Sequence, residues 1–469
     1  LDINMLQKFG EKFTDLFKRT MPDSFVFALI LTLITGLSAI LFVESTILEI
    51  LGSWYKGFWG LLEFGMQITL IVVTGYSIAL ASTTDRLLSK VSKRISSPLQ
   101  VYLTVIILGV LLSMISWGMV IIVAVLAREL ALRVKGINYP FLIACTYLSF
   151  TSWVTGLSSS IPLLMNTQDN FLIKQGVLDQ VVSTSLTLGS SLNFIIIFIY
   201  VFIVPLIIFM LIPKSSKNKE LKDLIIIGQQ DVKISIKKEA LLYKSKENNL
   251  SDKLNHSKVL QVSIFLMGLS YLVYYFNLNG FDLNLNIMIF IFIMLGLILH
   301  QTPKRYAISM KRASNNVYGI IFQFPFYAGI MGIVLHTGLG EAFSTWIASN
   351  ASISTFPYYS YLIGGIVNFA IPSGGGEFAV IGPSLIEAAI QLSANLPPDQ
   401  AYNYISRTAL SMAYGESLTN LLQPFFLLIV LPVMGSGTRI EARDVMGYLV
   451  IPFIILFVLE SLLILYLPI

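Results

Sequence analysis

The chain contains 469 residues, of which 55% are hydrophobic and 12% are charged, and it carries a formal net charge of +5. Because soluble domains carry about 25% charged residues, this composition excludes water-soluble, disordered and collagen-like proteins. The single cysteine, Cys145, excludes a disulfide-rich scaffold. Long runs without a charge, such as 194–212 and 287–299, predict an all-α integral membrane protein.

The predicted elements begin with an N-terminal segment, 1–23, in which Phe9, Phe13 and Phe17 recur every four residues. This spacing predicts an amphipathic helix at the membrane surface. After it we expect nine transmembrane spans, since a crossing helix needs about 20 apolar residues. They cover 24–44, 57–82, 140–165, 185–212, 259–276, 283–300, 314–338, 403–432 and 446–467.

Two further apolar segments, 99–133 and 357–392, are too long for one crossing, and small polar residues interrupt each near its middle. We predict that both are re-entrant hairpins, the first entering from the cytoplasm and the second from outside. With the N-terminus in the cytoplasm and the C-terminus outside, all Lys and Arg residues except Lys56, Lys174 and Arg407 are then cytoplasmic, as the positive-inside rule requires. The positive charge therefore indicates topology and not nucleic-acid binding.

The two halves of the chain share landmarks at nearly constant spacing. Ser116 and Ser373 lie 257 residues apart, and Glu129 and Glu387 lie 258 apart. An odd number of crossings separates the halves, which predicts inverted repeats over 24–212 and 259–469, joined by a Lys-rich cytoplasmic link, 213–258. Inverted repeats with interrupted helices are typical of secondary transporters that bind substrate near the membrane midplane.

The centre of the second hairpin, Asn368 to Glu377, contains Pro372 followed by a serine and three glycines. Proline removes a helical hydrogen bond, and glycines allow a tight reversal with bare backbone. We expect a half-helix to begin just after the glycines and to present its N–H groups to a carboxylate; a packing hinge is the alternative. The predicted substrate-binding residues are Ser116, Gly118, Asn368, Ser373, Gly374, Gly375, Gly376, Thr419 and Asn420.

Spans 140–165 and 403–432 have polar centres, 151–160 and 412–420, where we predict unwound segments whose carbonyls hold a small cation. Glu416 is an ionisable residue within a span and therefore a candidate cation ligand or proton carrier, or else a structural carboxylate. The predicted cation-binding residues are Thr151, Ser152, Gly156, Ser158, Ala413, Gly415, Glu416 and Ser417. Glu460 is expected to be a packing residue, and Arg407 to snorkel or to attract an anion.

No cofactor is predicted beyond Na⁺ or H⁺ as a coupling ion. Three separated histidines and one cysteine do not form a metal-ligand cluster, and the glycine run is not followed by the Lys-Ser or Lys-Thr of a phosphate loop. We therefore expect neither a metal site beyond a possible Na⁺ nor an ATP-driven pump. A membrane enzyme is also unsupported, because the sequence offers no nucleophile–base pair.

Residues 368–383 resemble the short-chain fatty acid transporter (AtoE) family, within the ion transporter superfamily. Residues 21–28 resemble the opening of that family, and 415–420 followed by 423–425 resemble a later motif. The likeness spans the whole chain except the Lys-rich link. Glu377 departs from the family, where a neutral or weakly basic side chain is usual, and Glu416 stands where Asp is common.

This resemblance implies a carrier of small anionic substrates such as acetoacetate or butyrate, coupled to Na⁺ or H⁺, in the inner membrane of the cell. It also implies scaffold and transport domains, elevator-like motion and a homodimer. Dicarboxylates, amino acids and peptides remain alternative substrates within the superfamily. An anion channel is a further alternative, although two hairpins that enter from opposite sides favour a carrier.

Overall fold

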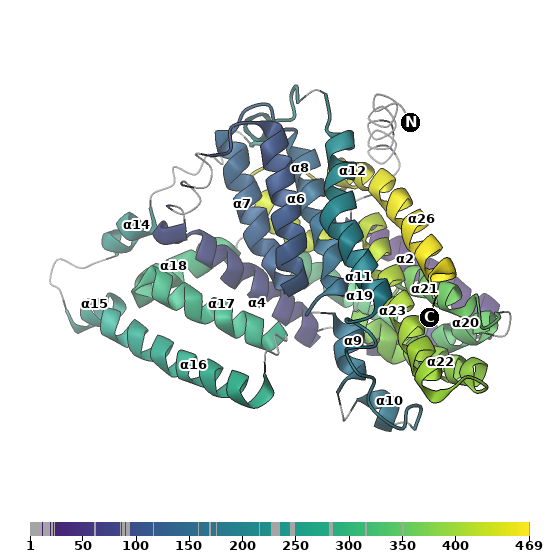
Figure 1. Ribbon diagram of the computed structural model, residues 1–469. Helices are drawn as coiled ribbons and strands as arrows, with labels where there is room; N and C mark the ends of the chain where they lie inside the picture. The colour runs from purple at the N-terminus through teal and green to yellow at the C-terminus, as the bar shows by residue number, and fades with distance from the viewer. Residues whose placement is uncertain are drawn as a thin grey trace.

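The computed structural model describes Lys12, Arg19, Pro22 and residues 24–468, except 61, 85, 87–89, 91–93, 116, 158, 168–169, 175, 215, 227–234, 244–248, 281–284, 315–316, 349–350 and 373. The amphipathic helix expected at 1–23 therefore lies outside the described residues. The described part is helical, with one isolated β-bridge between Ile225 and Thr438 (Figure 1). This confirms the predicted all-α fold for that part of the chain.

The helices of the first half begin at polar caps where the sequence supplies them. Thr46 and Glu49 form a capping box at the start of α3, and the Asn138 side chain accepts the N–H of Phe141 at the start of α8. The helices are α2 (Ser24–Val43), α3 (Ile47–Gly57), α4 (Leu62–Ala79), α6 (Pro98–Ile115), α7 (Val120–Arg133), α8 (Tyr139–Phe150), α9 (Ser160–Met165), α10 (Phe171–Lys174), α11 (Ser191–Phe198) and α12 (Val204–Leu211).

The described part of the Lys-rich link contains three short helices, α13 (Leu221–Leu224), α14 (Ile236–Leu242) and α15 (Leu250–Asn255). Apolar residues attach one of them to the rest of the protein. Ile236 and Ala240 of α14 are buried against Ile308, and Glu239 forms an ion pair with Arg312. The link therefore packs on the second half through α14.

The second half contains the two longest described helices, α16 (Lys258–Asn279) and α23 (Pro398–Thr419), with 22 residues each. The other helices of this half are α17 (Leu285–His300), α18 (Pro303–Ser314), α19 (Tyr318–His336), α20 (Leu339–Ala348), α21 (Phe356–Val367), α22 (Gly374–Ser393), α24 (Leu427–Met434), α25 (Ala442–Met446) and α26 (Val450–Tyr466). Ser257 caps α16 by accepting the N–H of Leu260, as polar caps do at helix starts.

Six described helical segments are long and apolar enough to cross a membrane, or seven if the pair Pro398–Leu422 and Leu427–Met434, bent by 43°, counts as one span. These segments support a multi-pass membrane protein, but not the predicted count of nine. Three expected spans, 57–82, 283–300 and 314–338, contain only shorter apolar helices, Gly65–Ile78, Asn286–His300 and Ile320–His336. Conversely, Pro98–Ile115, predicted to be one arm of a hairpin, is itself long enough to cross.

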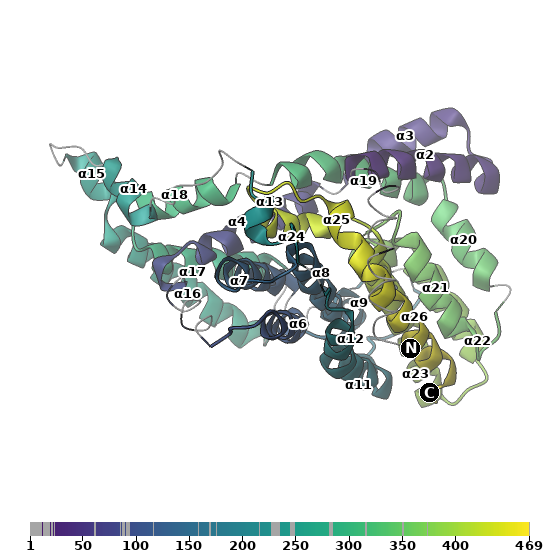
Figure 2. The same cartoon turned by 90° about the horizontal axis from the view of Figure 1, so that it is seen from above.

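The helices gather into three groups that both views separate. In Figure 1, α16, α17, α18 and α4 lie on the left, α6, α7, α8, α11 and α12 in the centre, and α20 to α23 with α26 on the right; Figure 2 shows the same separation from above. The two predicted hairpins occupy corresponding places. Helices α6 and α7 pack on α8, and α21 and α22 pack on α23.

Both polar span centres were expected to be unwound, and one of them is. After α8 ends at Phe150, a 3₁₀ segment, Thr151–Thr155, leads through Gly156 to α9. In the second half the predicted break at 412–420 is wrong, because α23 remains α-helical to Thr419 and a 3₁₀ turn begins at Asn420. Pro424 explains the shift, since a proline ring clashes with the carbonyl four residues earlier.

Candidate functional site

The interrupted helices of the two halves meet through buried hydrogen bonds. The Tyr147 hydroxyl in α8 donates to the Asn420 carbonyl, 2.7 Å away, where α23 ends. The Ser417 hydroxyl donates to the Thr151 carbonyl at 2.9 Å. All four residues are buried, so the ends of α8 and α23 form one polar junction inside an otherwise apolar core.

Three predicted substrate-binding residues come together at this junction. Asn368, at the end of α21, places its Nδ2 2.8–3.0 Å from the Glu416 carbonyl, the Thr419 hydroxyl and the Asn420 side-chain oxygen. Gln423 completes the cluster, because its Nε2 donates to the Asn368 carbonyl and to Asn420 Oδ1, both at 3.1 Å. The sequence prediction missed Gln423, although its position directly before the helix-breaking Pro424 was a signal.

The close approach of α21 and α23 depends on glycines. A Cβ at Gly415 would lie 1.9 Å from the Tyr361 carbonyl oxygen, and one at Gly364 would lie 2.4 Å from the Met412 carbonyl oxygen. Such backbone contact is the usual use of small residues between membrane helices. Gly415 therefore allows close packing within a regular helix and does not unwind it, contrary to our expectation.

The glycine run itself differs from the prediction in one respect. Helix α22 begins at Gly374 and not after Gly376, so Gly374, Gly375 and Gly376 form its first turn and the reversal occurs before them. The first N–H groups of a helix have no partner within the helix itself. Gly118 is buried in the 3₁₀ turn Trp117–Met119, and Ser116, Ser158 and Ser373 lie outside the described residues.

Two carboxyl groups, from Glu377 in the first turn of α22 and Glu416 in α23, are the most unusual feature of the junction. Both residues are 0% exposed. None of their four side-chain oxygens has a hydrogen-bond partner. Glu416 is the charged neighbour that acts electrostatically on Glu377, and the helices that carry them pack together. The sequence analysis assigned no role to Glu377.

Most of the other predicted cation-binding residues use their polar atoms within the protein. The Ser152 hydroxyl is 2.9 Å from both the Val110 and the Ser149 carbonyls, and Gly415 accepts a bond from the Thr419 hydroxyl at 3.1 Å. A Cβ at Gly156 would lie 2.0 Å from the Met114 carbonyl oxygen. Ala413 lies in the regular part of α23. Among the described members of this predicted set, Glu416 alone has a buried side-chain oxygen without a partner.

Glu460 was expected to be a packing residue, and the structure shows a more specific arrangement. It is fully buried in α26 and accepts hydrogen bonds from the hydroxyls of Tyr200, at 3.2 Å, and Tyr361, at 3.1 Å. Tyr200 lies in the π-helical turn Ile199–Ile203 and Tyr361 in α21. This carboxylate therefore links the two halves of the chain, a long-range contact that no local pattern could indicate.

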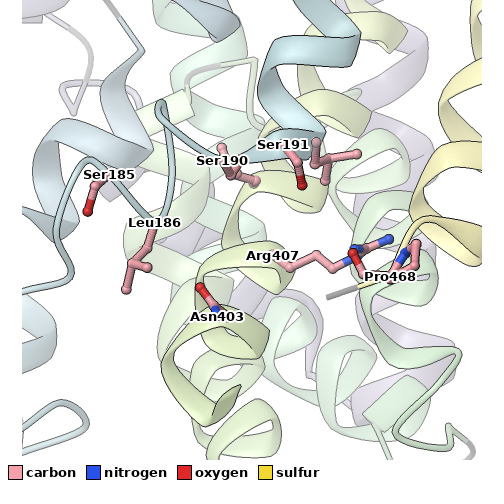
Figure 3. Close-up of a pocket in the computed structure, with 9 residues that line it drawn as sticks. Ser185, Leu186, Ser190, Ser191, Asn403, Arg407 and Pro468 are labelled. Carbon is pink, nitrogen blue, oxygen red and sulfur yellow. The ribbon is translucent and has the colours of Figure 1, made fainter. Parts of the chain in front are cut away.

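Arg407 does not snorkel, because its guanidinium is buried and bonds to the carbonyls of Leu463, Ile464 and Pro468 at the end of α26. It lines a cavity of about 150 Å³ that faces the segment before α11 (Figure 3). The figure shows its side chain extending toward Pro468, with Ser185 and Ser190 on the opposite wall. Arg407 thus caps α26 at a distinct place from the amide and carboxyl cluster.

The described residues contain no group of three or more His, Cys, Asp or Glu side chains that could hold a metal ion. The oxygens available at the junction are the two free carboxyl groups, together with Asn368 Oδ1 and Gln423 Oε1, which are also buried and unpartnered. Oxygen ligands of this kind suit a proton or a hard cation. The site therefore combines amide donors, the first turn of a helix and two partnerless acids.

Comparison with known proteins identifies the class to which the chain belongs. The family described as short chain fatty acid transporter matches residues 5–467. A protein of Escherichia coli (strain K12), provisionally named a short-chain fatty acid transporter, is 34% identical over 95% of this chain and 96% of its own length. A protein of Haemophilus influenzae with the same provisional name is 33% identical over 95% and 96%.

Two solved structures show a more distant likeness. The YdaH transporter of Alcanivorax borkumensis has a TM-score of 0.40 at 13% identity, covering 94% of this chain and 98% of that one. The MtrF protein of Neisseria gonorrhoeae has a TM-score of 0.39 at 16% identity, covering 99% and 97%. These scores support no argument about this chain.

The conclusion rests on the family match and the two relatives, together with apolar helices long enough to cross a membrane. The chain is a transporter and not an enzyme, and it belongs to the short-chain fatty acid transporter family.

Proposed function

We propose that this protein is a secondary active transporter of short-chain monocarboxylates, such as acetoacetate or butyrate, coupled to H⁺ or Na⁺ in the inner membrane of the cell. The observation that carries the proposal is the buried, partnerless carboxyl group of Glu416 beside the amide cluster of Asn368, Asn420 and Gln423. An ionisable group within the membrane marks a functional site by default.

The substrate carboxylate would bind where the first turn of α22 faces the junction. The positive end of the helix dipole there favours an anion, and Thr419 and the amides can add hydrogen bonds. A cation at Glu416 would remove the charge that otherwise repels the substrate. Binding of cation and anion would then favour each other, and linkage makes this coupling reciprocal.

The mechanism that fits this arrangement is alternating access by elevator-like motion, with the repeats 24–212 and 259–469 in opposite orientations. The hairpins 99–133 and 357–392 would be re-entrant and move with the transport domain, and two chains would form a homodimer. Residue 1 would face the cytoplasm and residue 469 the outside. Cysteines placed in 213–258 should then label only from the cytoplasmic side, and labelling from outside would refute this topology.

Uptake into liposomes tests the function directly. Labelled butyrate and acetoacetate should accumulate against their own gradients when an inward Na⁺ or H⁺ gradient is imposed. Equilibration without accumulation would indicate an anion channel, and preferred uptake of dicarboxylates, amino acids or peptides would reassign the substrate. Gly375→Val should abolish uptake while the protein still inserts, because a branched side chain would cover the backbone that the substrate must approach.

A further inference from the structure

We infer that Glu377 and Glu416 form one shared site that binds a single monovalent cation, H⁺ or Na⁺, between α22 and α23. The inference rests on the proposed function and deepens it, since it adds Glu377 and defines the site as a pair. Both carboxyl groups are fully buried, neither has a hydrogen-bond partner, the helices that carry them pack together, and Glu416 acts electrostatically on Glu377.

Two adjacent buried carboxylates cannot both stay ionised without compensation. Desolvation penalises each charge, and repulsion between like charges adds to the penalty in a medium of low dielectric constant. A buried acid that stays charged normally accepts hydrogen bonds or pairs with a base. The buried carboxyl group of Glu460 accepts hydrogen bonds from two tyrosine hydroxyls in the same protein. The Glu377–Glu416 pair lacks any such donor.

No basic side chain on the neighbouring described helices compensates the pair. Helix α22 packs on α9, α20, α21 and α23, and α23 packs also on α26 and the 3₁₀ segments at 151–155 and 420–422. Arg407 is the basic residue among these elements, and its guanidinium bonds to the end of α26. Glu341 of α20 is exposed, and Glu460 and Tyr361 bond to each other. A cation from solution is the remaining source of positive charge.

The neighbouring amides provide a second, independent indication of a ligand. Asn368 lies against the Glu416 carbonyl, yet its Oδ1 is buried without a partner, as is Gln423 Oε1. A Na⁺ ion would use such oxygens together with the carboxylates, whereas a proton needs only the two carboxyl groups.

Occupancy of this pair would control the substrate site. Glu377 lies in the first turn of α22, where the proposed function places the substrate carboxylate. With the cation bound, α22 and α23 can pack closely and the local negative charge is reduced. Without it, the two carboxylates push α22 away from α23 and repel a substrate carboxylate. Substrate binding would therefore require the cation.

The test uses the full-length protein in two assays. One measures labelled butyrate uptake into liposomes, and the other measures the Tm of the purified protein. Each assay is performed as two titrations. In the first, the Na⁺ concentration is varied at fixed pH, with K⁺ replacing Na⁺ to keep the ionic strength constant. In the second, the pH is varied in the absence of Na⁺. The variants are E377Q, E416Q and the double variant. Glu387→Gln is the matched control, because Glu387 lies on the same helix but is exposed.

We expect the Tm of the wild type and of E387Q to rise with either Na⁺ or falling pH, since a ligand that binds only the folded state stabilises it. The titration that moves Tm identifies the cation. Each single variant should lose most of that shift and most of the cation stimulation of uptake. The double variant should lose no more than the single variants, because a shared site gives non-additive effects.

Wild-type cation dependence in E377Q, with loss only in E416Q, would show that Glu416 acts alone and would overturn the pair. Wild-type cation dependence of uptake and Tm in the double variant would overturn the shared site as well. If substitution of the pair abolishes the cation-dependent Tm shift but the wild type transports no short-chain carboxylate, the pair stands and the proposed function fails. Should the double variant not fold, E377D, which keeps the charge, must restore the Tm shift that E377Q loses.

Discussion

The two helix pairs α6–α7 and α21–α22 occupy equivalent places in the two halves of the chain, but their surroundings differ. Near the end of α6, the Met114 carbonyl accepts the N–H of Leu157 at 2.7 Å, and Ser152 bonds to Val110. Near the end of α21, Asn368 joins an amide cluster beside two carboxyl groups without partners. Among the described residues, the buried groups without a partner near the first tip include the uncharged Trp153 Nε1 and Ser159 Oγ, whereas those near the second tip include two carboxyl groups.

This difference suggests a division of labour between the two helix pairs. Satisfied buried hydrogen bonds hold a fold together, whereas a buried polar group without a partner is costly and persists where function requires it. We therefore expect substitutions near the first tip to affect stability, and substitutions near the second tip to affect transport as well. The following predictions test that contrast, from the largest expected effect to the smallest.

The largest effect should come from Gly415→Ala and its counterpart Gly156→Ala. Each new Cβ would meet a backbone carbonyl oxygen, at 1.9 Å and 2.0 Å respectively, so helices must separate. We expect each to cost about 3 kcal/mol or more of stability, at the upper end for overpacking, measured as a lower Tm and lower membrane yield. The control is Gly52→Ala, because a Cβ at that position would have no atom within 4 Å, and we expect it to leave Tm unchanged. Gly176→Ala is a poorer control, because Gly176 has open surroundings but a positive φ that strains any other residue.

Asn368→Ala should have the next largest effect. It removes the Nδ2 donor from the Asn420 side chain and the Glu416 carbonyl, and stranded buried acceptors cost about 1–3 kcal/mol. Because Asn368 also belongs to the proposed substrate site, we expect butyrate uptake to fall further than Tm alone explains. Uptake normalised to folded protein, compared with a variant of equal Tm, measures this. Loss of uptake in proportion to folded protein would make Asn368 purely structural.

Glu460→Gln should have a smaller effect on stability and none on ion dependence. The amide can still accept a bond from one of the two tyrosines, so we expect a loss of about 1.5 kcal/mol, the upper end for a single hydrogen bond between uncharged groups. The cation dependence of uptake should match that of the wild type. A loss of that dependence would place Glu460, and not only the pair at the junction, in the ion site.

Ser152→Ala, near the first tip, should have the smallest effect. It removes one hydroxyl that contacts the Val110 and Ser149 carbonyls, at a cost of about 1 kcal/mol. Uptake per folded molecule and its ion dependence should not change. Altered ion dependence would contradict the view that the first tip is structural and would restore Ser152 to the cation site.

Some of this site could be predicted from the sequence because its signals are local. Pro372, the glycine run and Glu416 stand out within apolar segments, and they indicated the region that contains the two buried carboxyl groups without partners. Asn368, Thr419 and Asn420 were expected in one site, and the structure brings them together. The break in α23 was misplaced because glycine and hydroxyl residues permit unwinding without requiring it, whereas Pro424 does interrupt the helix.

By itself, the sequence determined that this is an all-α membrane protein and that the chain resembles a carrier family, while the inverted repeats stay a prediction. Hydropathy and charge are sums over many residues, so a single misjudged residue does not alter them. Only the tertiary structure decided which oxygens remain unpartnered, that the helices carrying Glu377 and Glu416 pack together, and that Glu460 joins Tyr200 to Tyr361. These facts depend on contacts between residues far apart in the chain, and a buried group's chemistry is set by its neighbours in space.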